Sequence, residues 1–127
     1  MKFKGTPGPW KAVQQYDDEI SVVDADGFKV VTAERIAILM DWDKKGFEHW
    51  TDEGGSRNLY GQEQFANAYL IAAAPELLEA LQGYMSAVKD MSEAMKDGYN
   101  VQGAISALVG WEDMARAAIA KAIGEEE

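Results

Sequence analysis

The side chains best suited to ligand chemistry lie between positions 42 and 57. This stretch combines aromatic rings with positive charge, carried by Trp42, Lys44, Lys45, His49, Trp50 and Arg57. Tryptophan stacks on bases and other rings, while lysine and arginine neutralise phosphate. The combination therefore predicts a binding site for a small anionic ligand such as a nucleotide. The alternative is a loop folded over the core, which would also use tryptophan.

Two further motifs carry weaker signals. Gly54 and Gly55 could present backbone amides to a phosphate beside Arg57, but the lysine and the strand-to-helix setting of a P-loop are missing. Asp24-Ala25-Asp26-Gly27 is similar to the opening of a calcium loop. The third ligand position and the closing glutamate of such a loop are missing, so we interpret this segment as a turn.

The residues needed for catalysis or metal binding are missing or badly spaced. His49 is the only histidine, and no serine stands in a nucleophile-elbow sequence beside which it could act. The chain has no cysteine, and the carboxylates around His49 lack the spacing typical of metal ligands. We therefore expect no catalytic residue, no metal site and no cofactor, and a function based on binding.

The charge balance restricts the partners. Twelve Lys and Arg against 22 Asp and Glu give a net charge of −10. This charge repels a phosphate backbone, so direct nucleic-acid binding is not expected. The acidity serves either solubility or a surface that docks on a basic host protein. No apolar run approaches the roughly 20 residues of a membrane helix, which predicts a cytoplasmic protein without membrane contact.

The first 40 residues are typical of β-structure. Alternating side chains predict a strand over residues 10–16, with Trp10 anchoring it to the helices. Residues 36–40 could be a buried strand or the start of a helix, and we favour the strand. The mixed composition that follows predicts a long loop over residues 41–60.

A β-hairpin is expected between these two strands. Residues 19–25 and 28–33 flank Asp26-Gly27, which favours a two-residue type I′ turn. The predicted register places Val22 opposite Val31 and Val23 opposite Val30.

From Gln62 onward the apolar pattern becomes helical. Pro75 cannot donate a hydrogen bond to Ile71, so the helix must kink there or restart with the proline in its first turn. Gly98 predicts the end of the second helix, and a third is expected from about residue 101 to residue 123.

Two apolar stripes are expected to face each other across these last two helices and to form the stability core. Their members are Leu81, Val88, Ile105 and Leu108. The methionines at helical spacing are expected in the same core rather than on an adaptable binding surface. They are Met85, Met91 and Met95.

These elements predict a single α+β domain over residues 1–127. Residues 1–40 are expected to be mainly β, 41–60 a long loop, 61–124 helical and 125–127 a frayed acidic tail. In this fold a small antiparallel N-terminal sheet, a β-meander or hairpin, packs on a C-terminal α-helical hairpin preceded by a shorter helix. So small a domain leaves apolar surface uncovered, so we expect a homo-oligomer.

Three blocks of sequence resemble a group of small phage and prophage accessory proteins. They are Thr6-Pro7-Gly8-Pro9-Trp10, residues 67–81 (NAYLIAAAPELLEAL) and residues 115–122 (ARAAIAKA). The blocks follow in the same order over nearly the whole chain. The resemblance implies a phage setting in the cytoplasm of the host cell, rather than a particular reaction.

The setting and the residues together favour a non-catalytic phage accessory protein of the counter-defence kind. In its most concrete form it sequesters a small anionic ligand, such as a nucleotide immune signal, in a pocket of the 42–60 segment completed by a second subunit. The alternative is an acidic interaction protein or nucleic-acid mimic that inhibits a host enzyme. A further alternative is a structural or morphogenesis factor. Sequestration predicts a basic, aromatic concavity, whereas mimicry predicts carboxylates spread over a convex face.

Overall fold

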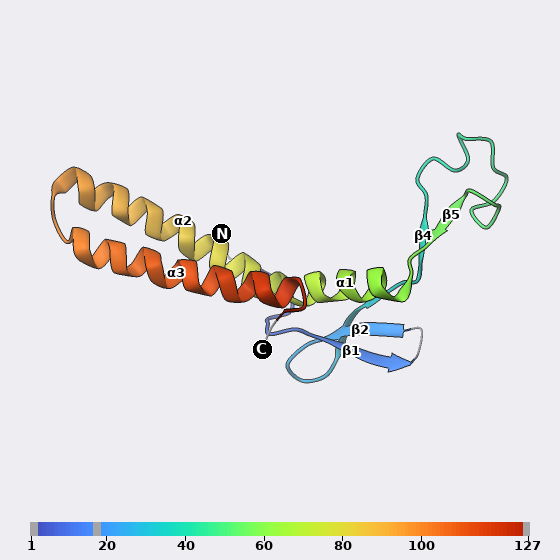
Figure 1. The fold of residues 1–127 in the computed structure, drawn as a ribbon, viewed down its shortest axis with the longest axis horizontal. Helices are drawn as coiled ribbons and strands as arrows, with labels where there is room; N and C mark the ends of the chain where they lie inside the picture. The colour runs from blue at the N-terminus through green and yellow to red at the C-terminus, as the bar shows by residue number, and fades with distance from the viewer. Residues whose placement is uncertain (1–2, 17–18, 126–127) are drawn as a thin grey trace.

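The computed structural model describes residues 3–16 and 19–125, which form an elongated molecule (Figure 1). In chain order the elements are β1 (Lys11–Tyr16), β2 (Glu19–Val23), β3 (Lys29–Ala33), β4 (Ile36–Ile38), β5 (Ser56–Asn58), α1 (Gly61–Ala72), α2 (Ala74–Asp97) and α3 (Val101–Ala122). The first three strands form an antiparallel sheet in the order β1-β2-β3, and β4 pairs with β5. The expected α+β class is confirmed, with a meander followed by a shorter helix and a helical hairpin.

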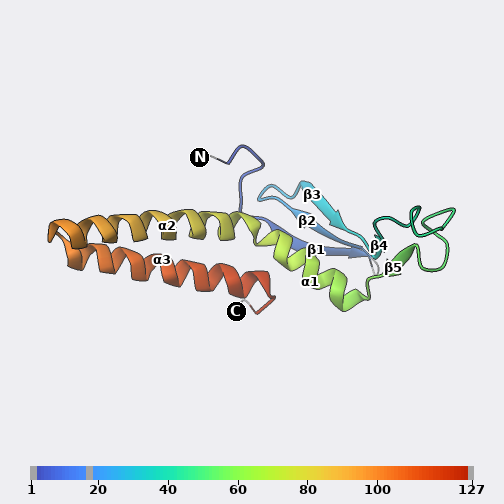
Figure 2. The same ribbon diagram turned by 90° about the horizontal axis from the view of Figure 1, so that it is seen from above.

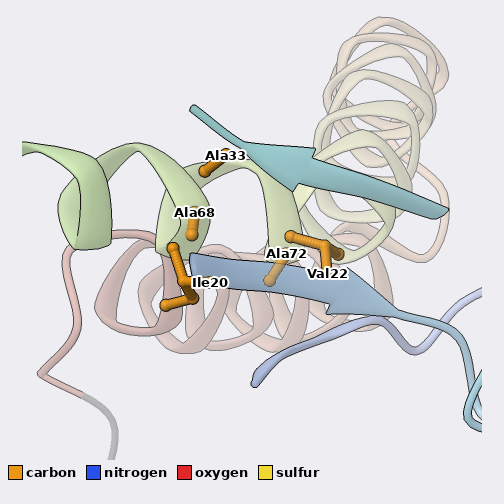
Figure 3. Packing of buried hydrophobic residues seen from close by; sticks show 5 residues of the cluster. All are labelled: Ile20, Val22, Ala33, Ala68 and Ala72. Carbon is orange, nitrogen blue, oxygen red and sulfur yellow. The ribbon is translucent and has the colours of Figure 1, made fainter. Parts of the chain in front are cut away.

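The main hydrophobic cluster lies between the three-stranded sheet and α1 (Figure 2). Side chains alternate along a strand, so β2 turns Ile20 and Val22 toward the helix. They meet Ala68 and Ala72 of α1, with Ala33 of β3 beside them (Figure 3). Small residues on α1 let the sheet approach closely. Around the cluster pack Trp10, Ala12, Phe65 and Ile71.

The register of the β2–β3 hairpin agrees with the prediction in part. Val22 lies opposite Val31, as expected. Val23 lies opposite Lys29 rather than Val30, because the ladder is irregular between Val22 and Val23.

The turn itself explains this shift. The Asp24 carboxylate accepts the backbone N–H groups of Asp26 and Phe28 at 3.0 and 2.9 Å. Gly27 has a φ of 87°, whereas Asp26 does not have a positive φ. A type I′ turn needs two successive positive φ values, so that prediction is wrong. Asp24 instead stabilises a longer turn, in which its own backbone N–H donates to the Phe28 carbonyl at 2.8 Å.

The strands β4 and β5 form a two-stranded arm that projects from the body of the molecule (Figure 1). Ile36 pairs with Asn58, and Ile38 pairs with Ser56. The strand expected over residues 36–40 is therefore present, but it ends at Ile38. It is also not buried, because Ile36 is 43% and Ile38 52% exposed. The segment expected as a loop over residues 41–60 is not all loop, because its last part is the return strand β5.

Pro75 separates α1 from α2. Helix α1 ends at Ala72, and α2 starts at Ala74 with the proline in its first turn. The chain therefore restarts its helix at this point, which was one of the two expected outcomes, because a first-turn residue needs no N–H donor. At the far end Gly98, with a φ of 68°, caps α2 as predicted.

Helices α2 and α3 pack through small residues. The buried positions are Ala80, Ala87, Ala104, Ala118 and Ala122. Half-buried residues continue this contact at three- and four-residue spacing, namely Met91, Ala94, Leu108, Trp111 and Ala115. We call these two facing rows the seam. Alanines at a seam allow the two helix axes to come close together.

The apolar stripes expected to face each other are mostly turned outward. Leu81 is 59% exposed, Val88 43% and Ile105 36%. Met85 and Met95 are each 65% exposed, so the prediction that they belong to the core is wrong. Four of these five residues directly follow a seam position, and Met85 lies four residues after Leu81, one helical turn further along α2. Only Leu108 and Met91 of the two predicted sets lie in the seam.

A close approach at Gly83 gives a test of this packing. A Cβ added at Gly83 would lie 2.3 Å from ring atoms of Trp111. Gly83→Ala should therefore lower the free energy of unfolding by about 1–2 kcal/mol, even after the helix propensity of alanine is counted. Gly110 of α3 has no atom within 4 Å of an added Cβ, so Gly110→Ala should raise it by about 0.5–1 kcal/mol. Denaturant titrations that shift both variants in the same direction would contradict the seam.

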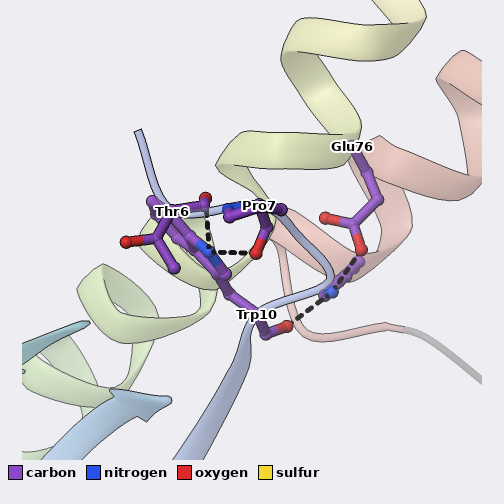
Figure 4. A network of polar contacts seen from close by, with 5 residues as sticks. Thr6, Pro7, Trp10 and Glu76 are labelled. Carbon is purple, nitrogen blue, oxygen red and sulfur yellow. Dashed lines mark hydrogen bonds and ion pairs between the residues drawn. The ribbon is translucent and has the colours of Figure 1, made fainter. Parts of the chain in front are cut away.

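The three sequence blocks that carry the phage resemblance meet at one junction (Figure 4). Lys121, near the end of α3, donates from Nζ to the Trp10 carbonyl at 2.8 Å and to Glu76 Oε1 at 2.7 Å. A Cβ added at Gly8 would lie 2.7 Å from Pro75 Cβ, so the N-terminal segment touches the start of α2. The junction thus fixes the N-terminal segment against both long helices.

The expected fraying of residues 125–127 falls mainly outside the described residues. Glu125 is described, and its N–H donates to the Ala120 carbonyl at 2.8 Å. Within residues 3–16 and 19–125, no helix combines the length and the apolar character needed to cross a membrane.

Candidate functional site

The loop at the end of the β4–β5 arm, residues 39–55, is an ordered unit that we call the tip. Its two ends are joined by a hydrogen bond from the Leu39 N–H to the Gly55 carbonyl at 3.1 Å. Inside the tip, the Phe47 N–H donates to the Trp42 carbonyl at 3.1 Å. Asp52 Oδ2 accepts the N–H groups of Glu48 and His49 at 3.0 and 2.9 Å. A loop held in this way, far from the main cluster, presents its side chains in fixed positions.

Three of the predicted site residues come together in the tip. The ring centroids of Trp42 and His49 are 6.2 Å apart, and those of His49 and Trp50 are 5.3 Å apart. The tryptophans are half-buried and His49 is exposed. The Thr51 N–H donates to His49 Nδ1 at 3.2 Å, so Nδ1 acts as an acceptor. In the neutral imidazole the proton is then on Nε2, which leaves a donor for a ligand.

The basic residues predicted for the site do not all join this ring cluster. Arg57 lies on β5 and forms an ion pair with Glu63 of α1, with Nη1 at 3.2 and 3.1 Å from the two carboxylate oxygens. Its expected place in a loop is therefore wrong, and its charge is already paired at the base of the arm. Lys44 lies 3.8 Å from Asp41, and Lys45 is exposed.

The local charge of the tip is negative. Residues 41–55 hold two lysines against five acidic residues, namely Asp41, Asp43, Glu48, Asp52 and Glu53, which gives a net charge of −3 with His49 neutral. The prediction of an anion-binding site counted the two lysines but not the five carboxylates that share the tip with them. An anionic ligand would meet this negative field.

The larger cavities in the described part of the chain lie outside the tip. An open groove of about 650 Å³ lies at the base of the arm and is lined in part by Glu19, Arg35 and Asn58. Cavities of about 310 and 180 Å³ flank the start of α2, and both are lined by Glu76. Residues of the tip line none of these three.

Neither Glu76 nor Lys121 was a predicted site residue, although the two form the junction beside the two smaller cavities. They are separated by 45 positions, so no local pattern joins them. The only signal was the placement of Glu76 in the first turn of a helix, where the positive end of the helix dipole favours a carboxylate.

The fold and the tip define a class of protein: an elongated α+β chain that presents an ordered aromatic loop on a two-stranded arm. The chain belongs to the family of Salmonella phage P22 protein Y8K6, because the model of that family matches residues 1–126. The expectation that the chain belongs to a phage protein family is thereby confirmed. Comparison with curated proteins and with solved structures gives no significant match.

Proposed function

We propose that this phage protein is a non-catalytic binding protein of the host cytoplasm, and that the tip is its contact site for a host protein. The observation that supports the proposal is the ordered ring cluster of Trp42, His49 and Trp50 at the end of a projecting arm. Ordering a loop away from the core costs conformational entropy. Binding of a partner by that loop would offset this entropic cost. Tryptophan is enriched among the interface residues that contribute most to binding.

The charge of the tip favours a basic partner surface over a small anion. Lys44 and Arg57 are each paired with a carboxylate, whereas Asp43 and Glu53 are exposed. Exposed carboxylates steer a positively charged surface toward the rings and give the complex its specificity. Sequestration of a nucleotide immune signal stays a prediction, and it requires Lys45 and His49 to outweigh the five acidic residues.

Reversing the charge of tip residues distinguishes a basic protein partner from a small anionic ligand. A tagged chain is used to capture proteins from a Salmonella lysate, and the affinity for a captured protein is then measured for purified components. Asp43→Lys with Glu53→Lys should weaken binding of a basic partner by at least about tenfold, and raising the salt concentration should weaken binding to the wild type. The matched control is Asp90→Lys, a reversal at an exposed position of α2 far from the tip, which should leave affinity unchanged.

The competing ligand class is tested with Lys44→Glu and Lys45→Glu in calorimetric titrations of cyclic and linear nucleotides. If the wild type binds a nucleotide and these variants lose it, sequestration replaces the proposal. If the partner binds the Asp43→Lys, Glu53→Lys double variant as tightly as it binds the wild type, the tip is not the contact site.

A further inference from the structure

The α2–α3 hairpin has one long apolar side that nothing in the described chain covers. The hairpin extends away from the sheet (Figures 1 and 2), and α2 and α3 pack on each other and on α1 but on no described strand. The large apolar residues on this side are 36–65% exposed. They are Leu81, Tyr84, Met85, Val88 and Met95 of α2, and Ile105, Val109 and Ile119 of α3. We call this set the apolar face.

Helix geometry places these residues on the same side. Leu81, Val88 and Met95 each follow a seam alanine by one position, and so do Ile105 and Ile119. One position turns a side chain by about 100° about the helix axis. The helices are antiparallel, so this turn carries the residues of both helices to the same side of the seam. Their spacing of three and four residues along each helix is the spacing with which helices pack in bundles.

The charges of the hairpin are segregated in the same way. Glu79, Asp90 and Glu93 each precede a seam residue by one position, and Asp97 lies four residues after Glu93. These exposed acidic residues therefore lie on the other side of α2. The 180 Å³ cavity confirms this placement at one point, because it joins Glu79 to Met114, Ala117 and Lys121 of α3. On the apolar face the charged pair is Glu112 with Arg116, whose Oε1 and Nη2 are 2.7 Å apart. A chain of net charge −10 therefore offers a side with balanced charge.

We propose that the occupant of this face is a second copy of the chain, so that two α2–α3 hairpins form a four-helix bundle about a two-fold axis. Two-fold symmetry brings a surface against itself. An apolar, charge-balanced face accepts its own copy, whereas the acidic side of α2 would repel its own copy. A two-fold axis near the centre of the face also brings the Arg116 of each copy toward the Glu112 of the other.

The size of the face agrees with this occupant. Eight apolar side chains, each about half exposed, offer on the order of 400 Å² of apolar surface. A stable interface of standard size buries about 800 Å² on each partner, of which a little more than half is apolar. Dimerisation through the apolar face does not depend on partner binding by the tip, so an experiment can contradict either one without the other.

The test compares two neighbouring residues on opposite sides of α2. The wild type should elute in size-exclusion light scattering with twice the chain mass of 14.0 kDa, and its melting temperature should rise with protein concentration. Met85→Glu, at a position 65% exposed in one chain, should weaken the dimer on the order of 100-fold, because symmetry buries the new charge twice. Ser86→Glu adds the same charge on the acidic side and should leave the dimer intact.

A wild type that stays monomeric at high micromolar concentration would overturn the proposal. So would equal dissociation of the two variants, or a dimer that persists in Met85→Glu. Circular dichroism checks that the variant keeps its helices. If Met85→Glu does not fold, Val109→Glu makes the same test from α3, where the residue is 50% exposed, with Ala107→Glu on the other side of that helix as its control.

Discussion

Replacing Ile20 with alanine is expected to lower the free energy of unfolding by about 2–5 kcal/mol. Ile20 is 3% exposed and lies in the cluster that joins β2 to α1. Its neighbours there include Ala68 and Ala72, which are too small to fill the space that the lost atoms leave, so a cavity adds to the lost burial. The change is measured by two-state denaturant titration at one fixed protein concentration.

Ile38→Ala is the matched control for this prediction. Ile38 lies on β4 and is 52% exposed, so the same substitution should cost less than about 1 kcal/mol. Similar losses for the two variants would show that the interface between the sheet and α1 is not the main source of stability.

Lys121→Met is expected to lower the free energy of unfolding by about 1–3 kcal/mol. The Lys121 side chain is 16% exposed and the Glu76 side chain 32%, so solvent weakens but does not replace their interaction. Glu76 Oε2 is already buried without a hydrogen-bond partner in the described part of the chain. Methionine keeps the length of the side chain but leaves Glu76 Oε1 and the Trp10 carbonyl without their donor.

Lys89→Met provides the comparison, because Lys89 is an exposed residue of α2. It should change the free energy of unfolding by no more than about 0.5 kcal/mol. If thermal melts followed by circular dichroism show equal effects for Lys121→Met and Lys89→Met, the junction does not contribute through its hydrogen bonds.

The limits of the helices could be predicted because single residues determine them. Pro75 has no N–H to donate, and Gly98 takes the left-handed conformation that ends a helix. The three-stranded meander and the pairing of Val22 with Val31 also agreed with the alternation of the sequence. These features depend on local backbone chemistry, so they could be predicted without knowing which other parts of the chain pack against them.

The faces of the long helices could not be predicted in the same way. Helix α2 carries two apolar rows at the same three- and four-residue spacing, one containing Ala80 and Ala87 and the other containing Leu81 and Val88. Periodicity cannot choose between two rows of equal spacing. Burial of large side chains favoured the second row. The fold uses the first, because small residues allow the helices to pack closely.

The candidate site shows a similar division. The ring cluster of Trp42, His49 and Trp50 could be predicted because its members lie within nine positions of one another. The pairing of Arg57 with Glu63 depends on the turn from β5 into α1, which the sequence did not reveal. The rings therefore lie together as their short spacing suggests, whereas composition overestimated the free positive charge around them. Their role as a binding site stays a prediction.

The tip and the apolar face lie toward opposite ends of an elongated chain (Figure 1), so occupying one leaves the other open. The proposed dimer, joined through the two hairpins, would carry two tips. Such a dimer would be bivalent: once one tip is bound, the second tip would meet another copy of the partner site at a high effective concentration, set by the distance between the two tips. A partner that is itself a symmetric oligomer or a filament would then be held far more tightly than its single subunit. In the proposed dimer, the distance between the two tips would therefore favour partners whose binding sites are repeated at the same spacing.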